Sequence, residues 1–272
     1  MPAVQPVAPG VIAADTITKL PPEADGAVVV SGSHGGRYPG YLAAKGRVRA
    51  AIFNDAGGGK DGAGLGSLAY LDALGIAAAT VAHDSARIGD TDDMIARGRI
   101  SAMNAAAQGV GLIVGMACLE AAVLLTSAPH RPSAAPELGE ARLEIADAGP
   151  RCIVLVDSAS LVRPEDAGRI VVTGSHGGLV GGDPAAALRT DGFAGVFNDA
   201  GIGIEEAGVG RLPALEARGI AAFTVSSASA RIGEGRSTFE DGIVSRVNAT
   251  AARLGAAEGI SARDLLERWA RL

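Results

Sequence analysis

An internal repeat constrains this chain more than any other feature. Residues 29–36, Val-Val-Ser-Gly-Ser-His-Gly-Gly, return at 171–178 as Val-Val-Thr-Gly-Ser-His-Gly-Gly, a shift of 142 (171 minus 29). The segments Phe-Asn-Asp-Ala-Gly at 53–57 and Ser-Ala-Arg-Ile-Gly at 85–89 return at 197–201 and 229–233, a shift of 144 (197 minus 53). Chance does not produce such a match, so we expect two diverged copies of one unit.

Weaker matches extend the repeated unit over about 11–125 and 153–269. We therefore predict a first repeat at 1–126, a linker at 127–150 and a second repeat at 151–272. The linker segment is rich in Pro, Ala and charged residues, as connecting segments are. A unit used twice implies internal pseudo-two-fold symmetry, as in a fused homodimer.

Each copy reads as alternating strand and helix, starting with strands at 11–14 and 153–156. In the first copy, 27–31, 49–53 and 76–81 are expected strands, whereas 38–45, 65–74 and 92–110 are expected helices. This order predicts an α/β fold of two tandem repeats, each a mostly parallel, flavodoxin-like sheet flanked by helices. The longest apolar stretch, 110–125, carries Glu120 and is too short to span a bilayer, so we expect a buried helix.

Composition narrows the classes of function. The chain is 48% hydrophobic, has a net charge of −6 and contains only five Phe, three Tyr and one Trp. An acidic chain with few aromatic residues is a poor nucleic-acid binder. Two cysteines, Cys118 and Cys152, supply neither a disulfide framework nor a thiolate metal cage. Residues 1–10 lack the features of a secretory signal, so we expect a cytoplasmic protein with no membrane partner.

The three repeated motifs each follow the carboxyl end of an expected strand. In an open α/β sheet these ends lie along one edge, where ligands bind. The first strand of each copy also delivers an acid, Asp15 or Asp157, to this edge. We therefore place the functional site where the repeated loops converge.

The Gly-Ser-His-Gly-Gly loops suit an anion cradle or oxyanion hole, because glycine lets backbone N–H groups approach a ligand. The alternative is a tight strand-to-helix turn. His34 and His176 are acid/base candidates, because imidazole exchanges a proton near neutral pH. Either histidine could instead cap its own turn.

The Asn-Asp-Ala-Gly loops place Asp55 and Asp199 where a carboxylate could orient a histidine or act as a base. Ser33, His34 and Asp55 would form a Ser-His-Asp set, although adjacent Ser and His rarely face each other. A pairing across the pseudo-two-fold is therefore favoured over a triad within one copy. The alternative for the Asn-Asp segment is an Asx-turn backed by glycine.

Arg87 and Arg231 are interpreted as guanidinium clamps for a carboxylate or phosphate, the alternative being an internal salt bridge to Asp55 or Asp15. No pair of His, Asp or Glu shows the spacing of metal ligands. The glycine loops lack the third glycine and the Lys-Ser/Thr of nucleotide-binding fingerprints. We therefore predict no metal and no cofactor.

The order of strand, His-Gly loop, helix, strand, small-residue loop, helix and strand resembles the α/β core of caspases and gingipains. The matching positions are His34-Gly35 or His176-Gly177. Where those proteins hold the nucleophilic cysteine, this chain has Asn54-Asp55-Ala56 or Asn198-Asp199-Ala200. The resemblance therefore implies a layered sheet, and the missing cysteine argues against cysteine peptidase activity.

The leading hypothesis is a cofactor-independent enzyme that acts by acid/base or hydrolytic chemistry on a small anionic carbonyl or amide compound. It would be an amide or ester hydrolase, or an isomerase or lyase. The rival is a non-catalytic module that binds a small anion, and a third possibility is an oligomeric scaffold. The candidate catalytic residues are Ser33, His34, Asp55, His176 and Asp199. The candidate substrate-binding residues are Gly35, Gly36, Asn54, Ser85, Arg87, Ser175, Gly177, Gly178, Asn198, Ser229 and Arg231. A homo-oligomer is left open.

Overall fold

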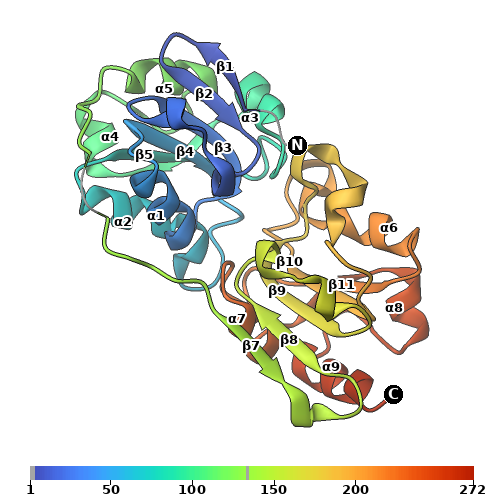
Figure 1. Cartoon of the computed structure of the whole chain (residues 1–272). Helices are drawn as coiled ribbons and strands as arrows, with labels where there is room; N and C mark the ends of the chain where they lie inside the picture. The colour runs from blue at the N-terminus through green and yellow to red at the C-terminus, as the bar shows by residue number, and fades with distance from the viewer. Residues whose placement is uncertain (1–3, 133–134) are drawn as a thin grey trace.

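The computed structural model describes residues 4–132 and 135–272. These residues form two six-stranded sheets, each flanked by helices, and the chain crosses once from the first half to the second (Figure 1). The first half runs from blue to green in the figure and the second from yellow-green to red. The predicted α/β class with two mostly parallel sheets is confirmed.

In both sheets the strands lie in chain order. The four inner strands are parallel and each edge strand runs antiparallel to its neighbour. The first sheet contains β1 (Val4–Ala8), β2 (Val11–Ala14), β3 (Val28–His34), β4 (Ala50–Asn54), β5 (Ala77–Val81) and β6 (Ile100–Met103). The second contains β7 (Arg142–Ile145), β8 (Ile153–Val156), β9 (Ile170–His176), β10 (Ala194–Asn198), β11 (Ala221–Val225) and β12 (Val244–Val247).

This strand order differs from the flavodoxin-like order, in which the second strand lies outside the first. That part of the prediction is wrong. The difference matters for function, because a sheet whose parallel strands follow chain order has no point at which the order reverses. It therefore lacks the crevice that such a reversal creates. A ligand site in this protein needs a second wall from elsewhere.

Side-chain alternation explains why helices cover both faces of the first sheet. Val29 and Phe53 point to one face, where they pack with residues of α1 (Arg37–Lys45) and α2 (Gly66–Asp72). Val30 and Ile52 point to the other face, toward α3 (Thr91–Arg97), α4 (Ala105–Gly109) and α5 (Cys118–Leu125). Burial on both faces accounts for the continuous apolar runs in these strands.

The second sheet is layered in the same way. Phe223 packs edge-on against Trp269 of α9 (Ala262–Ala270), with ring centroids 5.7 Å apart, on the face that also carries α7 (Gly235–Glu240) and α8 (Ala249–Arg253). Phe197 lies on the opposite face with α6 (Arg211–Glu216). Where the first half has α1, the second half has only two short 3₁₀ turns, η7 (Val180–Gly182) and η8 (Pro184–Ala187).

Two expected helices are interrupted. The expected helix at 92–110 is divided into α3, β6 and α4, because Gly98 ends α3 and the Asn104 side chain caps α4 by accepting from the Ala107 amide. Strand β6 forms between them by pairing with β5. Within the apolar stretch 110–125 only the last eight residues are helical, as α5.

The segment 127–150, interpreted from sequence as a linker, contains a strand. β7 pairs with β8 and so forms the edge of the second sheet. A short 3₁₀ turn, η4 (Ala146–Ala148), follows it. Within 4–132 and 135–272, no helix has both the length and the apolar character needed to cross a membrane.

Contacts between the halves occur in matched pairs. The Lys60 amide donates to Ser227 O (2.8 Å), and the Ile204 amide, 144 positions after Lys60, donates to His83 O (2.9 Å). Ala56 and Ile88 of the first half form one small apolar cluster with their counterparts Ala200 and Ile232. Gly57 and Gly201 meet so closely that a Cβ on either would lie 2.9 Å from the Cα of the other.

Candidate functional site

A cavity of about 880 Å³ lies between the two halves. Its wall includes the ends of β2 and β3 from the first half and the corresponding ends of β8 and β9 from the second. This volume lies within the range of small-molecule sites in proteins. The second wall that a single sheet lacks is therefore supplied by the other half of the chain.

A bulge at the end of β3 shapes the Ser-His segment. Val30 pairs with Ile52 and His34 with Asn54, so β3 contains two more residues than β4 over this stretch. β9 bulges in the same way between Val172 and His176. Bulges of this kind re-aim side chains at strand ends, and the serine and histidine of both bulges line the cavity.

His34 lines the cavity and is held as a neutral imidazole. Burial lowers its pKa to about 4. The Gly36 amide donates to its Nδ1 (3.2 Å), so the proton of the neutral ring lies on Nε2. A Cβ on Gly233 would lie 3.4 Å from His34 Cε1, which places the ring against the third repeated loop of the opposite half.

His176 occupies the corresponding place in the second half, against Gly89 of the first. Burial lowers its pKa well below the usual value, and the nearby charges of Arg211 and His34 lower it further. Its Nδ1 is enclosed and has no hydrogen bond of good geometry, although a backbone group of Gly178 lies near. The two imidazoles therefore come from opposite halves to the wall of one cavity.

Ser33 and Ser175 also line the cavity. Each hydroxyl oxygen accepts from a backbone amide, Ser33 from Ile17 (3.1 Å) and Ser175 from Ala159 (2.9 Å). A hydroxyl that accepts from the backbone still has its own proton to donate. Asp15 and Asp157 complete the matched set in the wall, and each accepts the amide that begins a helix of its own half, Thr91 and Gly235 respectively.

The amides of three of the glycines expected to form an anion cradle donate within the protein instead. The Gly35 amide donates to Asn54 O (2.7 Å), and the Gly36 amide donates to His34. In the second half the Gly177 amide donates to Asn198 O (2.7 Å). These glycines serve close packing instead, because a Cβ on Gly35 would lie 2.5 Å from Gly64 O. The tight-turn interpretation of these loops therefore fits the structure.

Asn54 and Asn198 are fully buried and bind only backbone, closing the turns at Ala56 and Ala200. Asp55 does orient a histidine, but that histidine is His83, at 2.9 Å, and not His34. Burial opposes ionisation of Asp55, yet its hydrogen bonds from His83 and the Gly57 amide hold its pKa below the usual value. The set of Ser33, His34 and Asp55 is therefore not assembled.

Asp199 accepts the amides of Gly201 and Ser227, because Ser227 stands where the first half has His83. Neither aspartate contributes to the cavity wall. The Asp55 hydrogen bond raises the pKa of His83.

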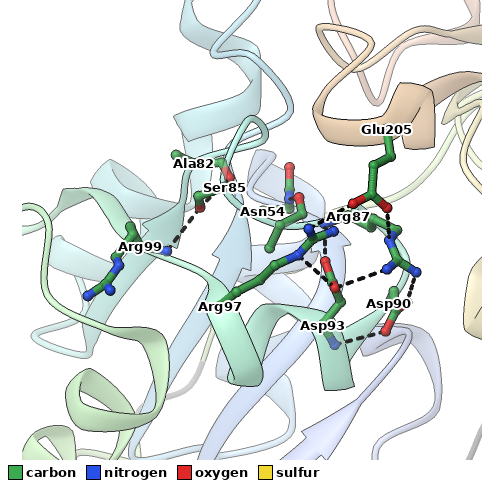
Figure 2. Close-up of polar contacts among 10 residues, drawn as sticks. Asn54, Ala82, Ser85, Arg87, Asp90, Asp93, Arg97, Arg99 and Glu205 are labelled. Carbon is green, nitrogen blue, oxygen red and sulfur yellow. Dashed lines mark hydrogen bonds and ion pairs between the residues drawn. The ribbon is translucent and has the colours of Figure 1, made fainter.

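Arg87 forms ion pairs within the protein and does not line the cavity. Its guanidinium contacts Asp90, Asp93 and, across the halves, Glu205 at 2.9 Å (Figure 2). Arg97 contacts Glu205 as well, at 2.8 Å. The salt-bridge interpretation fits Arg87, although its partners are neither Asp55 nor Asp15.

Arg231 lines the cavity while pairing with Glu234 and, across the halves, with Asp61 at 3.0 Å. Ser85 and Ser229 lie outside the wall. Each hydroxyl donates to the carbonyl three residues earlier and accepts a backbone amide from a later segment. Figure 2 shows this for Ser85, which lies between Ala82 and Arg99. Of the predicted residues, the wall brings together Ser33, His34, Ser175, His176 and Arg231.

Arg211 and Glu140 are two of the wall residues that were not predicted from the sequence. Arg211 is only 4% exposed and begins α6. The signal that could have revealed it is a lone arginine where the first copy has Ser67 (211 minus 144). Glu140 comes from the segment treated as a linker, and burial together with the nearby charge of Asp157 raises its pKa.

Across the described parts of the chain, no three His, Cys, Asp or Glu residues gather in a group that could hold a metal ion. No family model, no curated protein sequence and no solved structure matches this chain.

Proposed function

We propose that the cavity between the halves binds a small anionic carbonyl or amide compound, and that the chain acts on it by acid/base or hydrolytic chemistry without a cofactor. One observation carries this proposal. Two neutral imidazoles, the part-buried His34 and the buried His176, come from different halves to one cavity. Strongly shifted pKa values in a cleft are typical of functional sites.

The two histidines have different capacities. His34 presents Nε2–H as its donor, and a neutral imidazole can polarise a carbonyl oxygen by donating to it. His176 Nδ1 has no well-formed hydrogen bond, and a neutral imidazole has one nitrogen that can accept a proton from a substrate. Ser33 and Ser175 add hydroxyl donors. This combination supports proton abstraction beside a carbonyl or activation of water.

We further propose that the halves are homologous repeats related by a pseudo-two-fold axis through the cavity. The reciprocal contacts support this. The ion pair of Arg87 with Glu205 has its counterpart in that of Arg231 with Asp61, because 87 plus 144 is 231 and 205 minus 144 is 61. An interface in which residue i meets j and j meets i is that of a two-fold dimer. The chain would then hold one composite site instead of one site in each half.

The test is an NMR screen of small carboxylates, keto acids, amides and cyclic amides in D₂O. New resonances report hydrolysis or isomerisation, and loss of a C–H resonance reports proton exchange. We expect at least one compound to turn over, with a loss of at least about 100-fold in His34→Gln or His176→Gln. His130→Gln is the matched control, because His130 bonds to Arg47 O and neither residue lines the cavity.

The second candidate is a binding module. It is favoured by the absence, among the described residues, of a carboxylate hydrogen-bonded to either cavity histidine. In that case ligands would broaden or shift protein resonances without any chemical change in the screen. Turnover that survives both histidine substitutions would refute the proposed roles.

A further inference from the structure

Arg211 is the most deeply buried cation of the cavity wall. Its side chain is 4% exposed and lies where α6 begins, next to the His176 segment. Its counterpart in the first half is Ser67, a small neutral residue. The second half therefore gives the wall a buried arginine, whereas the first half has a neutral serine at the matching position.

Every described contact of the Arg211 guanidinium is with a neutral group. Nε donates to Gly178 O at 3.0 Å, Nη1 donates to the carbonyls of Ala186 and Ala187, and the group lies 5.0 Å from the centre of the Phe197 ring. Within the described chain, Nη2 makes no hydrogen bond and no carboxylate pairs with the group. Burial lowers the pKa of Arg211 to about 10. A buried cation without a counter-ion is unfavourable.

Among the described residues, no acid of the wall forms an ion pair with Arg211, and several of these acids have other partners. Asp61 and Glu234 pair with Arg231. Asp157 accepts the amides of Ala141 and Gly235, one on each carboxylate oxygen. A second polar group beside Arg211 also lacks a partner, because His176 Nδ1 is enclosed without a well-formed hydrogen bond. The unpaired charge of Arg211 points to a ligand that carries negative charge.

We propose that Arg211 binds a carboxylate group of the ligand, so that the substrate class of this cavity is small carboxylic acids. The planar guanidinium matches the two oxygens of a carboxylate. Because Ser67 offers no equivalent charge, the ligand binds in one orientation relative to the two histidines. This inference rests on the cavity assigned under the proposed function and adds the residue that selects its ligand.

The experiment measures thermal unfolding of the whole chain with propionate, lactate and pyruvate, each compared with its neutral amide at equal ionic strength. Ligand binding to the folded state raises Tm. We expect at least one carboxylate to raise Tm by several degrees in a concentration-dependent way, and the matched amide to raise it less. Arg211→Met should abolish this difference.

Arg218→Met is the matched control. Arg218 also donates to a carbonyl of the segment after η8, Leu188 O, and it pairs with Asp191 outside the cavity wall. Arg218→Met should lower the Tm measured without ligand, but it should not remove the response to carboxylates. If Arg211 were merely structural, Arg211→Met would lower the baseline and leave the response intact, which would overturn the proposal. Equal responses to carboxylates and amides in the unmodified chain would also overturn it.

A measurement on the unmodified chain covers the case in which Arg211→Met does not fold. A carboxylate bound to Arg211 neutralises the charge that lowers the pKa of His176. The imidazole resonances of His176 should therefore titrate at higher pH with a carboxylate than with its amide, and an unchanged titration refutes the inference. Carboxylate binding without turnover would refute only the proposed catalysis. Turnover that is unaffected by Arg211→Met would refute only the proposed role of Arg211.

Discussion

At the scale of single residues, the histidines of this chain experience opposite environments. His34 is kept neutral by burial, with its pKa lowered to about 4. His83 is part-buried, as His34 is, but its hydrogen bond to Asp55 raises its pKa. Only His34 lies in the cavity wall. Two residues of one type therefore affect stability in opposite directions as the pH changes.

The first prediction concerns His34 and acid. In the folded state the pKa of His34 lies below the ordinary 6.5. The stability that the neutral ring contributes to the fold is therefore present above pH 6.5 and is lost as the pH falls toward 4. At 1.36 kcal/mol per pKa unit, this one group would account for up to about 3 kcal/mol. His34→Gln should flatten the loss of stability between pH 6.5 and 4, measured by urea unfolding. An unchanged slope would contradict this, and His130→Gln provides the control.

The second prediction concerns His83→Ser, which copies Ser227 of the second half. The backbone bond should survive, because the Ser227 amide donates to Asp199 at the same 2.9 Å as the His83 amide to Asp55. We expect a loss of about 1 kcal/mol at pH 6. The loss should shrink as the pH rises through the raised pKa of His83, because protonated His83 is the form that Asp55 stabilises. A loss that is equal at pH 6 and pH 9 would show that packing, not charge, is responsible.

At the scale of elements, the repeated glycines are set by close approach between loops. A Cβ on Gly35 would lie 2.5 Å from Gly64 O and 2.8 Å from Thr80 Cγ2. Neither of these atoms is the end of a long, flexible side chain. The loop after β3 and the loop after β4 therefore pack backbone to backbone. This contact holds the bulge of β3 in place beside the cavity.

The third prediction follows from this contact. Gly35→Ala should destabilise the protein by about 2 kcal/mol or more, because backbone atoms must move to admit the methyl group. Gly109→Ala is the control, since a Cβ there would meet nothing within 4 Å and Gly109 ends α4. It should be neutral or stabilising by up to about 1 kcal/mol. Denaturant unfolding of both variants measures the difference, and equal effects would contradict the packing argument.

At the scale of the whole molecule, the halves are joined by a small apolar cluster and by ion pairs. Ile88 is 4% exposed among Ala56, Ala200 and Ile232. The Arg87 side chain, in contrast, is 42% exposed where it pairs with Glu205. Exposed ion pairs contribute little, whereas buried aliphatic contacts contribute more. The apolar cluster should therefore dominate the association of the halves.

The fourth prediction compares the two kinds of contact. Ile88→Ala should cost about 2 kcal/mol, and Arg87→Met should cost less than about 1 kcal/mol, with the smaller effect vanishing at high salt. Unfolding in urea at low and high salt measures both. If the arginine substitution cost as much as the isoleucine substitution, electrostatics would be the dominant link between the halves.

The amino-acid sequence by itself determined the repeat, the α/β class, the positions of the strands at 11–14 and 153–156, and the arrival of the Ser-His segments at strand ends. These features are readable because they depend on local periodicity and on glycine and asparagine signals near each motif. The same signals, Gly98 and Asn104, mark the break within 92–110, but the apolar pattern there also fits a continuous helix.

Only the tertiary structure decided which polar groups are free. The sequence does not show which acceptors the amides of Gly35 and Gly36 meet. In the fold, these amides donate to Asn54 O and His34 Nδ1. The sequence alone is compatible with a hydrogen bond from Asp55 to His34 or to His83. In the fold, the turn after β5 places His83 beside Asp55. Arg211 and Glu140 enter the wall from segments without a matching residue in the other copy. A hydrogen bond or a buried charge depends on what approaches from distant parts of the chain, and local sequence carries no record of that approach.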